Sequence, residues 1–144
     1  MKIKLQELKL AERTLTKIFG APFENAKLAY SIMKTSKKVL SEIGDMETMR
    51  FKLIQKYGEL GKDGRPVLAG NQFKLRDPKG FEKEWEEFLE TEIDLDVWML
   101  PFEAIEDMRL SIAELNTIDK FINEDKRKEE IKEAQESPQK EEVK

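Results

Sequence analysis

Carboxylate side chains gather between Phe81 and Asp96, and their types and spacing are the closest this 144-residue chain comes to a chemical site. Asp94 and Asp96 alternate with apolar residues, so in a strand both would lie on one face, where an Asp-x-Asp pair can bind Mg²⁺, Mn²⁺ or Ca²⁺ through oxygen. The other interpretation is a solvated or salt-bridged face that protects a sheet edge. We expect that second interpretation, and we keep a metal-dependent enzyme using Asp94 and Asp96 as a hypothesis.

The residue types that most other catalytic sites depend on are missing from the chain. The sequence contains no histidine and no cysteine, which excludes a thiolate zinc site, a cysteine nucleophile and any histidine-based triad. No glycine motif of the phosphate-binding kind occurs. We therefore expect no catalytic residues, no cofactor and a non-enzymatic protein.

Lysine side chains form a second group that could bind a ligand. They lie in a long predicted helix, and together they could follow the phosphates of a nucleic acid. The set is Lys27, Lys34, Lys37 and Lys38. Only one aromatic residue, Tyr30, lies close to them, and the sequence pI of about 5.2 argues against a nucleic-acid-binding protein. Nucleic-acid binding is therefore the alternative hypothesis, and a solvated helix face is the default.

The charge is distributed unevenly along the chain. Residues 1–62 carry a net charge of +6 and residues 63–122 carry −8, whereas the whole chain carries only −4. Either the two halves neutralise each other, within one chain or between chains, or one half meets an oppositely charged partner. The abundance of Lys and Glu, with no Cys, also fits a thermophilic source.

Hydrophobic spacing and capping residues predict the elements. A helix is expected over Lys4–Phe19 and a long one over Phe23–Leu60, with a bend allowed near Gly44. A β-hairpin is expected around Gly70-Asn71. Further elements are a helix capped by Asp77, a strand over Ile93–Met99, a helical turn at Pro101–Ile105 and a helix over Ile112–Ile122 that opens with a capping box of Ser111 and Glu114. The fold class is α+β and predominantly helical, with one long helix, three or four shorter helices and a small antiparallel sheet of two or three strands.

The long helix is also the predicted interface. Its apolar residues recur at a spacing close to 3.5. A continuous helix over Phe23–Leu60 would be more than about 50 Å long, which exceeds the diameter of a small domain. We expect it to support a homo-oligomer, with two shorter helices folded as a hairpin as the alternative. The predicted interface residues are Met33, Leu40, Ile43, Met46, Leu53 and Tyr57.

The domain organisation follows from a change in composition near residue 122. Residues 1–122 are predicted to form one domain. Residues 123–144 contain 14 charged residues among 22 and are predicted to be a largely disordered tail. The chain begins without an apolar leader segment and has no apolar stretch of about 18 residues, so we expect a cytoplasmic protein outside the membrane.

The order of several short segments resembles a known family. The matching pieces are Leu28-Ala29-Tyr30-Ser31-Ile32-Met33-Lys34, Leu53-Ile54-Gln55-Lys56-Tyr57-Gly58, Asp63-Gly64, Glu92-Ile93-Asp94-Leu95-Asp96 and Leu110-Ser111-Ile112-Ala113-Glu114-Leu115, closing at Phe121-Ile122. They are similar to short, uncharacterised proteins encoded by tailed phages and prophages of Gram-positive bacteria. The chain has Thr35 where that pattern has asparagine. The resemblance implies a phage origin and carries no activity and no catalytic residues.

The sequence thus predicts a non-enzymatic accessory protein that acts by protein–protein interaction. The expected setting is virion assembly or the binding of a host protein, inside the host cell or associated with the virion. The expected partners are a second copy of the chain, a phage structural protein or a host protein.

Overall fold

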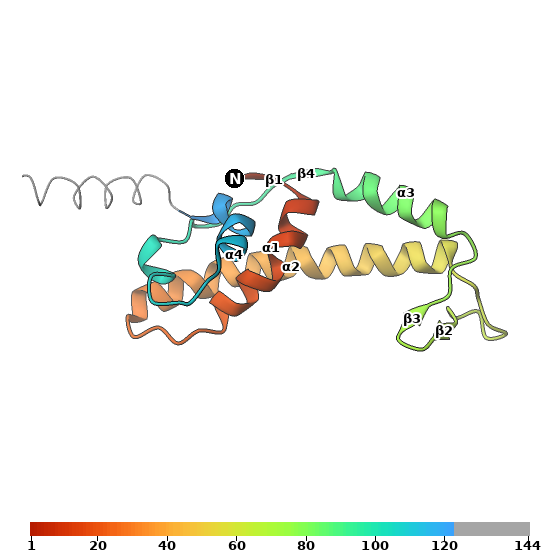
Figure 1. Ribbon diagram of the computed structural model, residues 1–144, viewed down its shortest axis with the longest axis horizontal. Coiled ribbons are helices and arrows are strands. Elements are labelled where there is room, and N and C mark those ends of the chain that lie inside the picture. The colour runs from red at the N-terminus through yellow and green to blue at the C-terminus, as the bar shows by residue number, and fades with distance from the viewer. Residues whose placement is uncertain (123–144) are drawn as a thin grey trace, which may run out of the picture. The chain divides into compact units, whose positions relative to one another are not determined.

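The computed structural model describes residues 1–122, so the predicted tail at 123–144 lies outside the described residues. The described chain is α+β and mostly helical, with one long helix, as predicted (Figure 1). The helices are α1 (Leu5–Phe19), α2 (Ala26–Tyr57), α3 (Pro78–Leu89) and α4 (Ile112–Thr117). The strands are β1 (Lys2–Lys4), β2 (Leu68–Ala69), β3 (Gln72–Phe73) and β4 (Glu92–Asp94). Two short 3₁₀ helices cover Phe102–Ala104 and Asp119–Phe121.

The long helix α2 is continuous through Gly44, so the alternative of two shorter helices is not what the chain adopts. Its start is capped by Asn25, whose Oδ1 accepts hydrogen bonds from the backbone N–H groups of Lys27 (2.9 Å) and Leu28 (3.1 Å). Those two donors have no partner inside the helix, which is why asparagine is favoured there.

The described chain divides into two compact units. Unit 1 consists of Met1–Leu10 and Lys37–Asp96, and unit 2 consists of Ala11–Ser36 together with the chain from Val97 onward. Both α1 and α2 contribute residues to each unit. The single domain expected over residues 1–122 therefore stays a prediction, and each unit is described below by itself.

Unit 1 contains a small antiparallel sheet of β1 and β4, which lie side by side in Figure 1. The register pairs Ile3 with Ile93, and the backbone N–H of Leu5 donates to Thr91 O at 3.0 Å. Strand β1 covers Lys2 and Ile3, where no element was expected, and Lys4, the first residue of the expected helix. Strand β4 ends at Asp94, shorter than the predicted Ile93–Met99, because its pairing with the start of the chain ends where Leu95 N donates to Met1 O at 2.7 Å.

The buried apolar residues of unit 1 come from β1, the start of α1, α2 and the chain after β4. On α2 those from Val39 to Leu53 are spaced three, four or seven residues apart and Ile54 follows directly, so they occupy one face of the helix. They are Ile3, Leu5, Leu8, Val39, Ile43, Met46, Leu53, Ile54 and Leu95.

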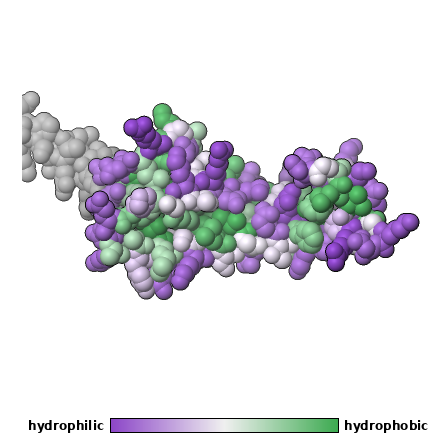
Figure 2. All heavy atoms as spheres, turned by 90° about the horizontal axis from the view of Figure 1, so that it is seen from below, coloured by the Kyte–Doolittle hydropathy of each residue, from purple (hydrophilic) through white to green (hydrophobic). Residues whose placement is uncertain are grey.

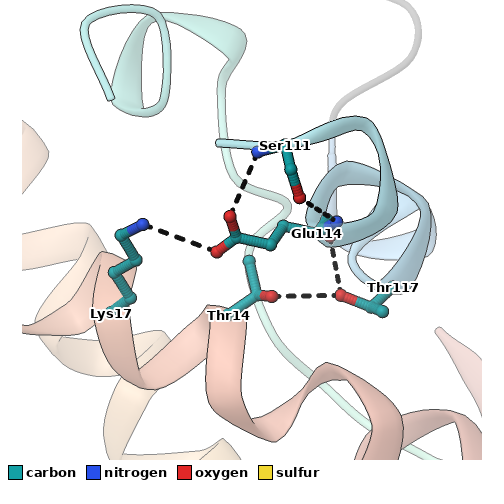
Figure 3. A network of polar contacts seen from close by, with 5 residues as sticks. All are labelled: Thr14, Lys17, Ser111, Glu114 and Thr117. Atoms are coloured by element: carbon teal, nitrogen blue, oxygen red, sulfur yellow. Dashed lines mark hydrogen bonds and ion pairs between the residues drawn. The ribbon is translucent and has the colours of Figure 1, made fainter. Parts of the chain in front are cut away.

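Unit 2 is held by a network of polar contacts between α1 and α4 (Figure 3). The predicted capping box is confirmed: Ser111 N donates to Glu114 Oε1 and Glu114 N donates to Ser111 Oγ, both at 3.1 Å. Lys17 on α1 lies 3.5 Å from the same carboxylate, and the hydroxyl oxygens of Thr117 and Thr14 lie 3.2 Å apart, within hydrogen-bonding distance. The N–H of Ser111 and, further out, the charge of Lys17 lower the pKa of Glu114.

The end of unit 2 differs from the expected single helix over Ile112–Ile122. Helix α4 stops at Thr117, whose hydroxyl donates to its own helix at Glu114 O (2.6 Å), and a 3₁₀ helix follows. The buried Thr35 donates to Trp98 O at 3.2 Å. A short polar side chain is thus satisfied there within unit 2.

Candidate protein-binding surface

A small ladder of backbone pairs builds what we call the hairpin arm, residues 58–75 of unit 1. Strands β2 and β3 pair Leu68 with Phe73, as the Gly70-Asn71 turn predicted. Isolated bridges join Gly58 to Leu75 and Leu60 to Pro66. Because paired residues and alternate residues of a ladder share a face, most apolar side chains of the arm fall on one side, and Val67 and Ala69 fall on the other. This apolar face consists of Leu60, Pro66, Leu68, Phe73 and Leu75.

Glycine allows the arm to leave α2 and to turn. A Cβ at Gly58 would overlap the carbonyl oxygen of Ile54, the acceptor of its own backbone N–H. Gly70 has a φ of 68°, a left-handed conformation that costs other residues about 1 kcal/mol or more. The arm therefore begins at Gly58 and reverses at Gly70 because of these two residues.

The apolar face of the arm is open to solvent. Leu68 is 58% exposed and Leu60 is 48% exposed. Phe51 on α2 meets Phe73 edge to face, with ring centroids 6.1 Å apart, yet Phe51 remains 43% exposed. Figure 2 shows apolar residues gathered on one side of the molecule over this hairpin. Single exposed apolar residues are ordinary, but a gathered set marks a surface that another molecule covers.

Basic residues surround this face in the sequence. From Arg50 to Arg76 the chain has seven Lys and Arg against Glu59 and Asp63. Lys52 follows Phe51 on α2, and Lys62 follows Leu60 by two residues in the turn of the arm; both are exposed. Neither lysine has an ion-pair partner within residues 1–122. The arm therefore combines an apolar face with uncompensated positive charge.

Helix α3 has the opposite character. It begins as predicted, with Asp77 Oδ1 accepting from Gly80 N at 3.1 Å and Pro78 in the first turn. None of its residues is buried, although its apolar positions Phe81, Trp85, Phe88 and Leu89 are half-covered. The rings of Trp85 and Phe88 stack at 5.5 Å. Four glutamates against two lysines occupy its other positions, so α3 is an acidic helix with a half-open apolar stripe.

The attachment of α3 to α2 depends on one glutamate. Glu84 Oε1 accepts hydrogen bonds from Lys56 Nζ (2.6 Å) and from Tyr57 OH (2.9 Å). The bond from Lys56, then that from Tyr57, lowers the pKa of Glu84, and Glu84 raises the pKa of Lys56. Beside α3 lies a cleft of about 430 Å³ lined by Gln6, Lys83, Glu86, Glu87, Leu89 and Glu90.

The structure divides the six predicted interface residues. Ile43, Met46 and Leu53 are buried within their own chain, so their side chains are not available to a partner. Tyr57 is half-buried and bonded to Glu84. Only Met33 (unit 2) and Leu40 (unit 1) are exposed. Of the six predicted interface residues, these two on α2 stay available to a partner. The spacing of 3.5 residues shows which side chains share a face of the helix, but not whether that face packs against its own chain or against another.

The four lysines of the nucleic-acid alternative are all exposed, but they fall in both units. In unit 2, Lys34 lies over the ring of Tyr30 at 5.4 Å. In unit 1, Lys38 donates to Asp96 O at 2.6 Å and lies 3.5 Å from the Asp96 carboxylate. Its charge is therefore partly neutralised within the chain. Lys27 and Lys37 have no ion pair within the described part of the chain.

The two aspartates of the metal hypothesis are each paired with a different cation. Asp94 Oδ1 lies 3.2 Å from the amino group of Met1, and Asp96 lies against Lys38. Among residues 1–122 no group of three or more His, Cys, Asp or Glu is arranged to hold a metal ion. The structure thus places Asp94 and Asp96 in ion pairs, the interpretation expected for a salt-bridged strand face.

The sequence did not single out Leu60, Leu68 and Phe73 as binding residues. The signal that could have found them is the alternation of Phe73 and Leu75 with polar residues after Gly70-Asn71, which gives that strand of the hairpin one apolar face. No family model, curated protein or solved structure matches the chain. Within residues 1–122, no helix combines the length and the apolarity needed to cross a membrane.

Proposed function

We propose that the protein is a non-enzymatic accessory protein of a phage or prophage that acts by protein–protein contact and self-associates. One observation carries the proposal: the apolar face of the hairpin arm, on which Leu60 and Leu68 are each about half exposed, lies against the similarly exposed Phe51 of α2. An apolar face of this kind gains free energy when a second protein surface removes it from water. The resemblance of the sequence segments to phage proteins supports the origin.

The arm supports protein contact better than α2 does. Leu40 is the one predicted interface residue of α2 that is exposed within unit 1. The residues on either side of it offer no apolar surface, since Val39 is buried and Ser41 is polar. The arm instead offers several apolar side chains on one face. Protein interfaces concentrate their binding energy in such clusters with aromatic members.

The experiment is a measurement of solution mass by size exclusion with light scattering. The full chain would be run over a hundredfold range of protein concentration, with absorbance read at 260 and 280 nm. We expect an oligomer free of nucleic acid. A monomer at every concentration contradicts self-association. A particle with 260 nm absorbance that is lost at high salt would favour the nucleic-acid alternative instead.

A further inference from the structure

We propose that the apolar face of the hairpin arm in one copy of the chain packs against the acidic helix α3 of a second copy. This inference rests on the proposed self-association and names the two surfaces that meet. Both surfaces belong to unit 1, so every copy carries both the arm and its complement. A two-fold dimer would then make the contact twice.

The apolar parts of the two surfaces complement each other. The arm presents Leu60 and Leu68 beside the Phe51–Phe73 pair. Helix α3 presents an apolar stripe of which no residue is fully buried in its own chain. Each surface is therefore incompletely covered, and each would lose apolar area to the other. A helix laid on a small apolar sheet face is an ordinary way for two layers to pack.

In its own chain α3 does not cover the arm. The start of α3 is tied to the end of α2, since the backbone N–H groups of Arg76 and Asp77 both donate to Tyr57 O. Glu84 fixes the middle of the helix to Lys56 and Tyr57. With α3 held in this way, Leu60 and Leu68 remain about half exposed, so the arm stays open to a helix of another copy.

Charge favours the same pairing. From Arg50 to Arg76 the chain has seven basic and two acidic residues, of which Lys56 is paired with Glu84 of the same chain, and α3 itself has four glutamates and two lysines. Glu82 and Glu86 are exposed on successive turns of α3 and have no ion pair within the described residues. Lys52, next to Phe51 in the sequence, and Lys62, two residues after Leu60, are likewise exposed and without an ion pair within residues 1–122. Opposite charges around an apolar contact steer association and fix its register.

The exposed leucines of the arm form a face along which a helix can lie. The tips of the arm are polar, with Asp63-Gly64 at one turn and Gly70-Asn71 at the other. Leu60 and Leu68 lie on the face between these tips, so a helix laid along this face would cover both.

The decisive experiment exchanges the charges between copies. We expect the variant Lys52→Glu/Lys62→Glu and the variant Glu82→Lys/Glu86→Lys each to raise the dimer dissociation constant at least about tenfold, because like charges then face each other. An equimolar mixture of the two variants should recover the mass of the parent dimer. In the mixture every arm meets a helix of opposite charge.

Matched controls separate this contact from general effects. Lys27→Glu/Lys34→Glu makes the same change in net charge in unit 2 and should leave the dimer intact. Leu68→Glu should dissociate the dimer, whereas Ile112→Glu, at an 80% exposed residue of α4, should not. Far-UV circular dichroism and thermal melts of each variant check that the chain still folds.

The outcomes distinguish the surface from the function. If the parent is a dimer and the two charge variants stay dimeric, or stay monomeric when mixed, the pairing of arm and α3 is overturned while self-association stands. If the parent is a monomer at every concentration, both proposals fall. Recovery of the dimer only in the mixture supports the inference.

Discussion

Tyr57 at the end of α2 donates a 2.9 Å hydrogen bond to Glu84 in the middle of α3, and Lys56 donates to the same carboxylate oxygen. Tyr57 was predicted to face a partner chain. It instead helps to hold the acidic helix in place within its own chain, together with the neighbouring lysine.

This attachment makes the stability of unit 1 depend on pH. The folded pKa of Glu84 lies below its ordinary value of 4.5, so its contribution is present above that value and is lost as the pH falls toward the folded pKa. We expect the melting temperature to fall as the pH is lowered below about 5, and Glu84→Gln to make that fall shallower. Melts between neutral and acid pH measure it. Glu87→Gln, which makes the same charge change on α3 away from Lys56, is the control, and an equal effect of both variants would contradict the assignment.

Neighbouring positions on α2 should respond very differently to the same substitution. Ile43 is 8% exposed, so Ile43→Glu buries a charge without a partner and should destabilise unit 1 by about 3 kcal/mol or more. Leu40 is 49% exposed, and Leu40→Glu should change the free energy of unfolding by less than about 0.5 kcal/mol. Urea denaturation of the two variants compares them. Similar losses of stability in both would mean that Leu40 is covered.

Alanine substitutions at two glycines of unit 1 should change the free energy of unfolding in opposite directions. Gly44 lies in the middle of α2 with nothing near the position of a Cβ, so Gly44→Ala should stabilise the protein by about 0.5–1 kcal/mol. Gly70 has a positive φ, and Gly70→Ala should destabilise the arm by about 1 kcal/mol. Chemical denaturation gives both numbers. A loss of stability in Gly44→Ala would argue against a straight helix through that residue.

Removing the capping box of α4 should lower the stability of unit 2. Ser111→Ala removes the acceptor of the Glu114 N–H and should cost about 1 kcal/mol of stability. Thr16→Ala on α1 removes an exposed hydroxyl that bonds only within its own helix, and it should change stability by less than about 0.5 kcal/mol. Thermal melts compare the two variants, and a Ser111→Ala melt equal to that of the parent would refute the role of the cap.

Elements with local signals could be predicted from the sequence. Asp77 and Pro78 start α3, Ser111 and Glu114 start α4, and Gly70-Asn71 turns the hairpin, because in each case the contact lies within four residues of the signal. Strand β1 could not be predicted. Three residues have no periodicity of their own, and their partner Ile93 is about ninety residues away.

The candidate surface was predictable only in part. Helical spacing shows which residues share a face of α2, but whether that face is covered depends on contacts from distant segments, as the difference between Leu40 and Ile43 shows. The unequal charge of the two halves was visible in the sequence. Which of these charges lie on the arm and which lie on α3 could be known only from the structure.

The pairing of β1 with β4 also has a consequence for the synthesis of the protein. Ile3 lies in β1, whereas its partner Ile93 lies about ninety residues later in the chain. Closing a loop of that length costs about 4 kcal/mol of chain entropy before any contact forms. The β1–β4 sheet of unit 1 therefore forms only after residues 92–94 have been made, and until then β1 lacks its partner strand.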